Sequence, residues 1–202
     1  GATARGAGEL FKGVMAEVAI YNRQLDAHEI ANIFLADSAG KCAATNQPPL
    51  VCAPAAPGMV AWWRGENNVL DSIGGSASSL LDGMSFGSGQ VGQAFRFDGE
   101  NDAIRVAAGP VIDVGLHAGF TFEAWINPTR ISIGQIVEWN DGVSSTGVHL
   151  WHSVDTAVAG DGVANLYANL VDTSGGSHAF WSPSGLVALN SYNHVALTYD
   201  KA

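Results

Sequence analysis

Short runs of apolar and aromatic residues alternate with turns rich in Gly, Asn, Asp and Ser from residue 59 onward. In the clearest run, "FTFEAWINP", every second residue from Phe120 to Ile126 is apolar, while Glu123 and Trp125 lie between them. A period of two is that of a β-strand, because successive side chains point to opposite faces. Such runs, without helical patterns between them, predict antiparallel sheets rather than a parallel α/β fold.

The segment "FKGVMAEVAIYNRQLDAHEI", residues 11–30, begins as a strand and continues into a helix. Alternation places Val14, Ala16, Val18 and Ile20 on one face of the strand. Asp26 and Glu29 have the spacing of a capping box, and an apolar stripe follows them. We therefore predict one short helix over residues 26–36.

Residues 39–58 contain four prolines, both cysteines and mostly small residues, which predicts a semi-rigid linker outside the core. Cys42 and Cys52 flank a stretch that can turn at Pro48 and Pro49. In an extracellular protein they predict a disulfide, and in a cytosolic one two free thiols. A zinc site is not expected, because a structural zinc ion needs four ligands.

The composition limits the partners of the chain. Its 202 residues are 47% hydrophobic and 14% charged, with a formal net charge of −10. A negative chain does not attract nucleic acid or anionic membranes. We expect no membrane insertion, because no stretch approaches the roughly 20 apolar residues that span a bilayer.

Four motifs occur in a recognisable order: "GMVAWWRGENNVLDSIGG", "GQVGQAFRFDGENDAIRV", "FTFEAWINP" and "YNHVALTYD". Together they resemble the laminin G-like domains of the concanavalin A-like superfamily, as found in bacterial secreted proteins. The resemblance implies an all-β, antiparallel, two-sheet jelly-roll sandwich. It covers residues 59–202, which would then lack the closing strands of such a domain.

The first 38 residues resemble the opposite end of the same kind of domain, its closing strand and terminal helix. Three arrangements are open. The chain is a window from a tandem array of repeats, or a permuted subunit whose closing strand pairs with its own body, or a subunit whose closing strand completes another copy in a fibre.

Catalysis is not expected, and we predict that the protein is not an enzyme. Glycosidases of this superfamily need two carboxylates about 5 Å apart on one groove. Glu123 stands alone on its predicted strand, and Asp141 follows Glu138 only across a turn. We interpret Glu123 and Glu138 as solvated or hydrogen-bonded carboxylates on an outer face, and His194 as a hydrogen-bonded structural residue.

A calcium site is a further prediction, because hard cations bind oxygen-rich loops. The loop "GENNVLDSIGG" offers Glu66, Asp71 and the carbonyl group of Gly74. The resemblance implies that the aspartate joins a carboxylate of the closing strand, here Glu17. The family usually has Asp-Glu where this chain has Ala16-Glu17, so one ligand is missing. The alternative is a set of ordinary turn residues.

Tryptophans are candidates for stacking on sugar rings. Trp139 and Trp151, with Asn140 and Asp141, are the predicted ligand-binding residues, because polar loops lie between their strands. We predict a non-catalytic extracellular or cell-surface module for adhesion or carbohydrate binding, within a multidomain or repeat-containing protein. Its partners would be a glycan or an extracellular protein, and neighbouring copies of the domain. The alternative is a structural subunit of an extracellular fibre, assembled by exchange of the closing strand.

Overall fold

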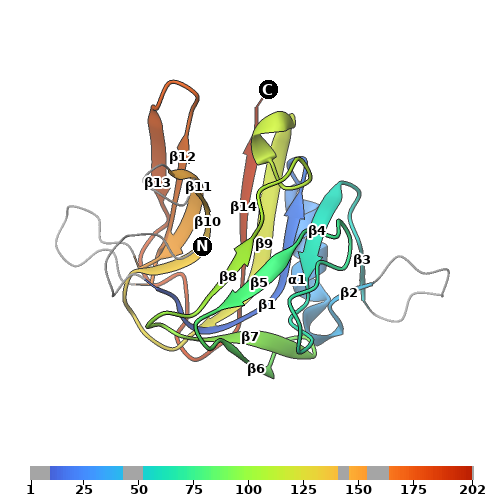
Figure 1. The fold of residues 1–202 in the computed structure, drawn as a ribbon, viewed down its shortest axis with the longest axis vertical. Helices are drawn as coiled ribbons and strands as arrows, with labels where there is room; N and C mark the ends of the chain where they lie inside the picture. Colours follow the sequence, from blue (N-terminus) through green and yellow to red (C-terminus); the bar gives the residue numbers. More distant parts are fainter. Residues whose placement is uncertain (1–9, 43–51, 141–145, 154–163, 202) are drawn as a thin grey trace.

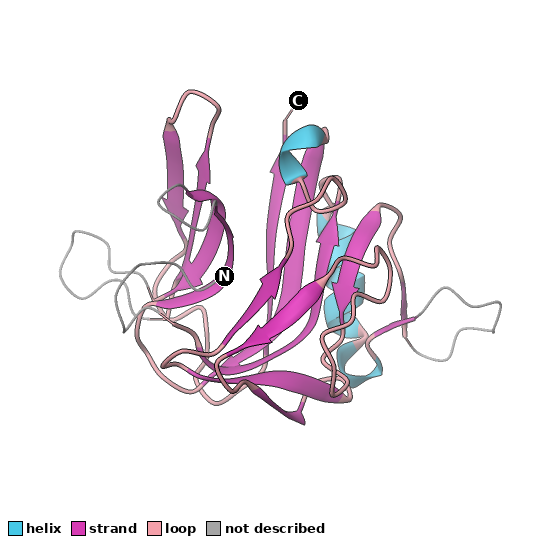
Figure 2. Cartoon of the chain, viewed as in Figure 1, coloured by secondary structure: helices cyan, strands magenta, loops and turns pink. Residues whose placement is uncertain are grey.

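The computed structural model of the chain describes residues 10–42, 52–140, 146–153 and 164–201. These residues form mainly antiparallel sheets and one α-helix, which lies against one sheet (Figures 1 and 2). The predicted all-β sandwich with one short helix is confirmed. The helix α1 (Ala27–Leu35) starts after the capping box that the sequence predicts at Asp26 and Glu29.

Six strands form the larger sheet, in the order β14-β9-β1-β7-β6, with β4 paired to β1 beside β7. Their bounds are β1 Lys12–Tyr21, β4 Met59–Trp63, β6 Ser85–Ser88, β7 Gln93–Asp98, β9 Gly119–Pro128 and β14 Asn193–Asp200. A four-stranded sheet has the order β10-β11-β12-β13. Its strands are β10 Gly134–Asn140, β11 Thr146–His152, β12 Leu166–Val171 and β13 Ser177–Trp181.

Two small sheets and two short helices complete the fold of the described residues. The strands β5 (Ser78–Leu81) and β8 (Ala103–Val106) pair antiparallel, and β2 (Lys41–Cys42) and β3 (Ala53–Pro54) pair parallel. The 3-10 helix η1 (Asp37–Ala39) follows α1, and the 3-10 helix η2 (Val114–Leu116) precedes β9.

The strand β1 lies inside the larger sheet, although it comes first in the chain (Figure 1). Along one edge it pairs with β9; along the other, residues 12–15 pair with β7 and residues 18–21 with β4. The first strand of the chain and strands from residues 59–202 of the same chain thus form one sheet. The tandem-array and exchange arrangements, in which β1 of a neighbouring copy occupies this slot, stay predictions.

A β-bulge interrupts β1 at Glu17, whose φ is 58°. The register with β9 shifts between Ala16 and Ala19, so the strand changes phase there. Val18 and Ile20 face the interior between the two main sheets, whereas Ala16 lies on the outer face with Trp125. The predicted common face for Val14, Ala16, Val18 and Ile20 is therefore wrong, because one extra residue inverts the alternation.

The larger sheet is buried on both faces. Its inner face packs against the four-stranded sheet through a core that includes Phe95 and Phe122. Its outer face is covered by α1 and by both ends of the predicted linker, where Lys41 and Ala53 are buried. The prediction of a linker outside the core is wrong at these two positions, because each packs against the sheet.

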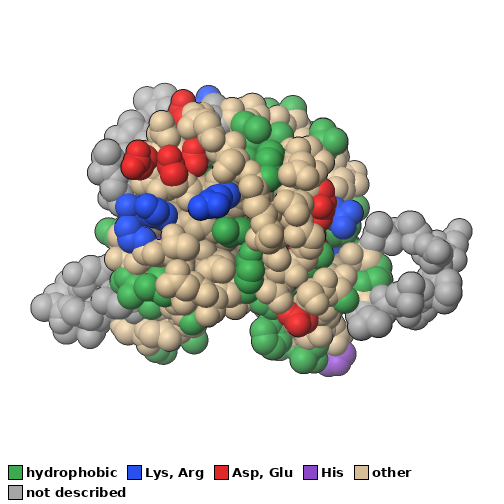
Figure 3. All heavy atoms as spheres, turned by 90° about the horizontal axis from the view of Figure 1, so that it is seen from below, with side chains coloured by type: hydrophobic (Ala, Val, Ile, Leu, Met, Phe, Trp, Pro, Cys, Tyr) green, Lys and Arg blue, Asp and Glu red, His purple; other side chains and the backbone are tan. Residues whose placement is uncertain are grey.

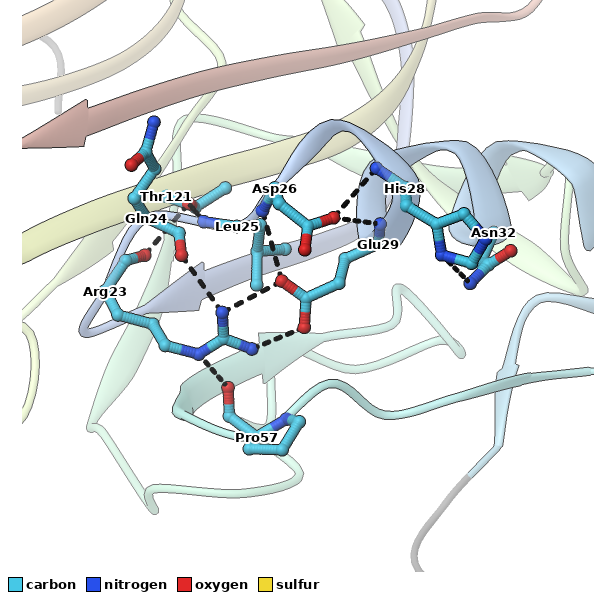
Figure 4. A network of polar contacts seen from close by, with 9 residues as sticks. All are labelled: Arg23, Gln24, Leu25, Asp26, His28, Glu29, Asn32, Pro57 and Thr121. Carbon is cyan, nitrogen blue, oxygen red and sulfur yellow. Dashed lines mark hydrogen bonds and ion pairs between the residues drawn. The ribbon is translucent and has the colours of Figure 1, made fainter.

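A network of hydrogen bonds fastens the start of α1 to β9 and to the linker (Figure 4). The Leu25 amide donates to Thr121 Oγ1 at 2.8 Å, and the Thr121 hydroxyl donates to the Arg23 carbonyl at 2.9 Å. Arg23 Nε donates to the Pro57 carbonyl at 2.8 Å. We call α1 and the two ends of the linker the cover of the outer face. These hydrogen bonds attach it both at the start of the helix and at the linker.

Candidate functional site

A cluster of four charged or titratable side chains lies buried on the outer face of the larger sheet, beneath this cover. The bulge of β1 supplies Glu17, β9 supplies Glu123, β14 supplies His194 and β2 supplies Lys41. Lys41 Nζ lies 2.8 Å from Glu123 Oε1 and 3.5 Å from Glu17 Oε2, and donates to the Glu17 carbonyl at 2.9 Å. His194 Nε2 lies 2.9 Å from Glu123 Oε2.

The pKa values of the two carboxyl groups of this cluster are shifted in opposite directions. Burial raises the pKa of Glu17 and outweighs the attraction of Lys41 and Arg64. Burial also opposes ionisation of Glu123, but Lys41 and His194 outweigh it and lower the pKa of that carboxyl. Carboxylates with separated pKa values are typical of acid–base catalysis. Here both side chains are at most 1% exposed, so they lie beneath the cover rather than in an open groove.

This arrangement decides two predictions from the sequence. His194 is a hydrogen-bonded structural residue, as predicted. Glu123 is hydrogen-bonded and on the outer face, but it is fully buried rather than solvated, because α1 and the linker cover that face.

The four residues proposed for calcium do not form a shared site. Asp71 accepts hydrogen bonds from the amides of Trp62, Ile73, Gly74 and Ser76, at 2.9 to 3.1 Å, and thereby shapes its own loop. Glu66 accepts from the Gln93 amide at 3.3 Å, and Glu17 pairs with Lys41. Within the described ranges, no three His, Cys, Asp or Glu side chains are grouped so as to hold a metal ion. The residues do not fit calcium, whose binding stays a prediction without geometric support.

The predicted disulfide between Cys42 and Cys52 is present, with a Cα–Cα distance of 5.3 Å. It closes the loop between β2 and β3, immediately after Lys41. The bond therefore holds the backbone of β2 next to the buried cluster. The alternative of two free thiols does not apply to this structure.

A row of aromatic rings crosses the outer face of the four-stranded sheet. The Trp181 ring lies 5.0 Å from that of Tyr167, which lies 6.0 Å from Trp151 and 5.4 Å from His149. Neighbouring residues on these strands, such as Leu150 and Ala168, face the core instead. Trp181 is 43% exposed, whereas Trp151 and His149 are 6% and 5% exposed. The accessible end of the row is therefore on β13.

Trp139 lies on the opposite face of this sheet from Trp151. Its ring is 6.2 Å from Phe120, and its Nε1 donates to the Ile112 carbonyl at 2.9 Å. Asn140 Nδ2 donates to Glu138 Oε1 at 2.8 Å, and Asp141 is outside the described residues. The structure does not bring Trp139 and Trp151 into one site, and Trp151 is not at the surface as predicted.

Sequence reasoning missed Tyr167 and Trp181 as partners in a row. Each lies in a recognised strand, "ANLYANLV" or "HAFWSP", and the alternation places its ring on a definite face. The sequence does not give the register between the strands. That register pairs Tyr167 with Trp151 on one side and with Trp181 on the other. Only the pairing of strands puts these rings side by side.

The described helices and the face of the molecule seen in Figure 3 bear on membrane and electrostatic binding. No helix in the part of the chain that the structure describes is long and apolar enough to cross a bilayer. Seen from below, acidic and basic side chains lie beside each other, and hydrophobic side chains are scattered among polar ones (Figure 3). This face therefore offers no strong electrostatic site.

Comparison with known proteins identifies the family. A family model described as the concanavalin A-like lectin/glucanases superfamily matches residues 98–202, slightly more than half of the chain. The chain belongs to this superfamily. The laminin G-like resemblance is thereby confirmed, and domains of this kind are in general carbohydrate- or ligand-binding modules. No curated protein and no solved structure matched the chain.

Proposed function

We propose that this member of the superfamily is a non-catalytic extracellular module that binds glycans at the exposed end of its aromatic row. The observation that carries the proposal is the pair Trp181 and Tyr167, whose rings lie 5.0 Å apart on the outer face of the sheet. The face of an aromatic ring is an apolar surface on which the C–H groups of a sugar can pack. Trp181 is accessible to such a ligand because it lies on the edge strand β13.

Polar groups beside the two rings support a sugar rather than a purely apolar ligand. Ser177 and Asn169 lie on the same face of β13 and β12, and the Ser177 hydroxyl donates to Asn169 Oδ1 at 2.8 Å. Binding sites for small ligands combine aromatic walls with a few placed polar groups. The disulfide supports an extracellular location, because such bonds persist in oxidising compartments.

A glycan array with matched variants tests this proposal. Trp181→Ala removes the accessible ring, and Phe180→Ala removes an equally exposed ring from the opposite face of the same strand. We expect Trp181→Ala to weaken glycan binding at least about tenfold, corresponding to about 1.4 kcal/mol, and Phe180→Ala to leave it unchanged. Equal losses in both variants, or binding to no glycan by the parent chain, would contradict the proposal.

The alternative function is a structural subunit of a fibre, and the position of β1 favours it specifically. Because β1 has partners along both edges, the same strand from a neighbouring copy would make the same hydrogen bonds. Light scattering over a range of concentrations separates the two functions. Assemblies that grow with concentration, and filaments in electron micrographs, support exchange; a monomer at all concentrations excludes it.

A further inference from the structure

A cavity of about 430 Å³ lies between the larger sheet and two other strands, β8 and β10. Its lining includes two unbroken runs of residues, Asp102–Ala108 and Gln135–Asn140. Successive residues of a strand point to opposite faces, so a cavity beside one face would touch only every second residue. Unbroken runs therefore mean that the cavity lies along the edges of β8 and β10. We call this cavity the edge groove.

The two strands that border the edge groove are the last strands of their sheets. Among the described residues, β8 pairs only with β5. The named partner of β10 is β11, and on the other side of β10 the described chain adds one isolated bridge, between Leu10 and Gln135. A terminal strand presents backbone N–H and C=O groups that can pair with another strand.

The floor of the edge groove is apolar. Its lining includes fully buried residues such as Phe95 and Phe122, and half-buried apolar residues of three sheets: Val18, Phe97, Ile104 and Val137. The half-buried side chains leave apolar surface that the apolar side chains of a ligand can cover. A sugar, whose hydroxyl groups need many hydrogen-bond partners, is a poor match for this floor.

One carboxylate at the wall of the groove has an oxygen without a partner in the described structure. Asp102 is 7% exposed; its Oδ2 accepts from the Asp98 amide at 2.8 Å, but its Oδ1 accepts no bond. Buried polar atoms are nearly always paired, so this oxygen indicates that a hydrogen-bond donor belongs in the groove.

We propose that the edge groove binds an extended strand of a partner polypeptide chain whose side chains are apolar at alternate positions. Its backbone pairs with residues 136–139 of β10, its apolar side chains cover the floor, and β8 borders it on the other side. One of its N–H groups is the donor that Asp102 lacks. The docked strand also continues an existing interface, because Leu10 already pairs with Gln135 in parallel orientation.

A pair of synthetic peptides tests this proposal on the intact chain. The probe is a peptide of alternating valine and threonine with lysines at both ends. The control peptide has the same side chains but carries N-methyl groups on alternate amides, which removes backbone donors. We expect the probe to slow amide hydrogen exchange at residues 103–106 and 136–139 at least about tenfold, and the N-methylated peptide to have no effect.

A pair of variants locates the effect. Val106→Asp puts a charge on the β8 wall of the groove, whereas Ser79→Asp puts one on the exposed neighbouring strand β5. We expect only Val106→Asp to abolish protection, with circular dichroism showing that both variants fold. The N-methyl comparison keeps the test decisive if Val106→Asp does not fold.

Four outcomes would overturn the proposal. No protection by the probe means that the groove does not accept a strand. Protection confined to β13 or β14 means that another edge binds it. Equal binding of the N-methylated peptide means that the groove takes apolar groups without backbone pairing. Protection of the same amides by self-association, in the absence of peptide, means that the occupant is a second copy of this chain.

Discussion

The two faces of the larger sheet bury polar groups in different ways. On the outer face, Glu123 is paired with Lys41 and His194, and Glu17 with Lys41 and Arg64, beneath α1 and the two ends of the linker. At the edge groove, the buried Asp102 has no cation partner among the described residues, and its Oδ1 accepts no hydrogen bond. Burying a charged group is unfavourable unless it is paired. The comparison indicates that the outer carboxylates are paired with cations within the chain, whereas the carboxylate at the groove leaves room for a further donor.

The largest expected effect is on the outer face. Lys41→Met removes the cation between two buried carboxylates, and breaking a buried pair in this way costs about 3–5 kcal/mol. Urea unfolding should show a loss of stability of this size. Lys12→Met, which removes an exposed lysine from β1, serves as the control and should change little. A small effect of Lys41→Met would mean that the cluster does not hold the cover in place.

A pH dependence is expected from His152, on the groove side of the molecule, whose ring lies 5.5 Å from that of Phe11. Burial, and secondarily the charge of Arg130, lowers the pKa of His152 to about 4. Its unfolded pKa is about 6.5, so below that pH the unfolded chain binds a proton that the folded chain does not. The free energy of unfolding therefore does not depend on the protonation of His152 well above pH 6.5. It declines by about 3 kcal/mol as the pH falls to about 4.

The comparison for His152 is between the parent chain and His152→Gln, each unfolded with urea at several pH values. Acidic groups titrate in both proteins, so the difference between the two curves isolates the imidazole. We expect this difference to change between pH 6.5 and 4 and to be constant above pH 7. Parallel curves throughout would contradict the assignment.

A smaller loss is expected from Asp71→Ala. The variant leaves four backbone amides without their carboxylate acceptor, and we expect it to destabilise the fold by about 2 kcal/mol. Because this role needs no metal, a chelator should not change the melting temperature of either protein. Glu100→Ala, in an exposed turn, is the control. A melting temperature that falls on chelation in the parent chain but not in Asp71→Ala would instead establish calcium binding at this loop.

The smallest effect distinguishes the two faces most directly. Asp102→Asn keeps an acceptor for the Asp98 amide and removes a buried charge that has no cation partner among the described residues, so stability should be unchanged or raised by up to about 1 kcal/mol. The matched change Glu123→Gln removes a charge that pairs with Lys41 and should be clearly destabilising. Equal losses in the two variants would show that the faces do not differ in this respect.

Much of the local structure was predictable from the sequence. Alternation identified the strands, the Asp26–Glu29 spacing identified the helix, and the order of four motifs identified the family. Trp62 and Trp63 face opposite sides of the larger sheet, as the period of a strand requires. These features are set by residues within a few positions of one another, and a single sequence contains that information.

The candidate sites depended on contacts between distant parts of the chain. The bulge at Glu17 inverted the faces of β1, and the aromatic row arose from the register of three strands. Lys41 came from a segment that the proline content assigns to a linker, yet it pairs with Glu123 on β9. The sequence by itself determined which segments are strands and which family they form. Only the tertiary structure decided which edges stay open and which charges meet, because strand register and long-range packing are properties of the whole sheet and not of any local pattern.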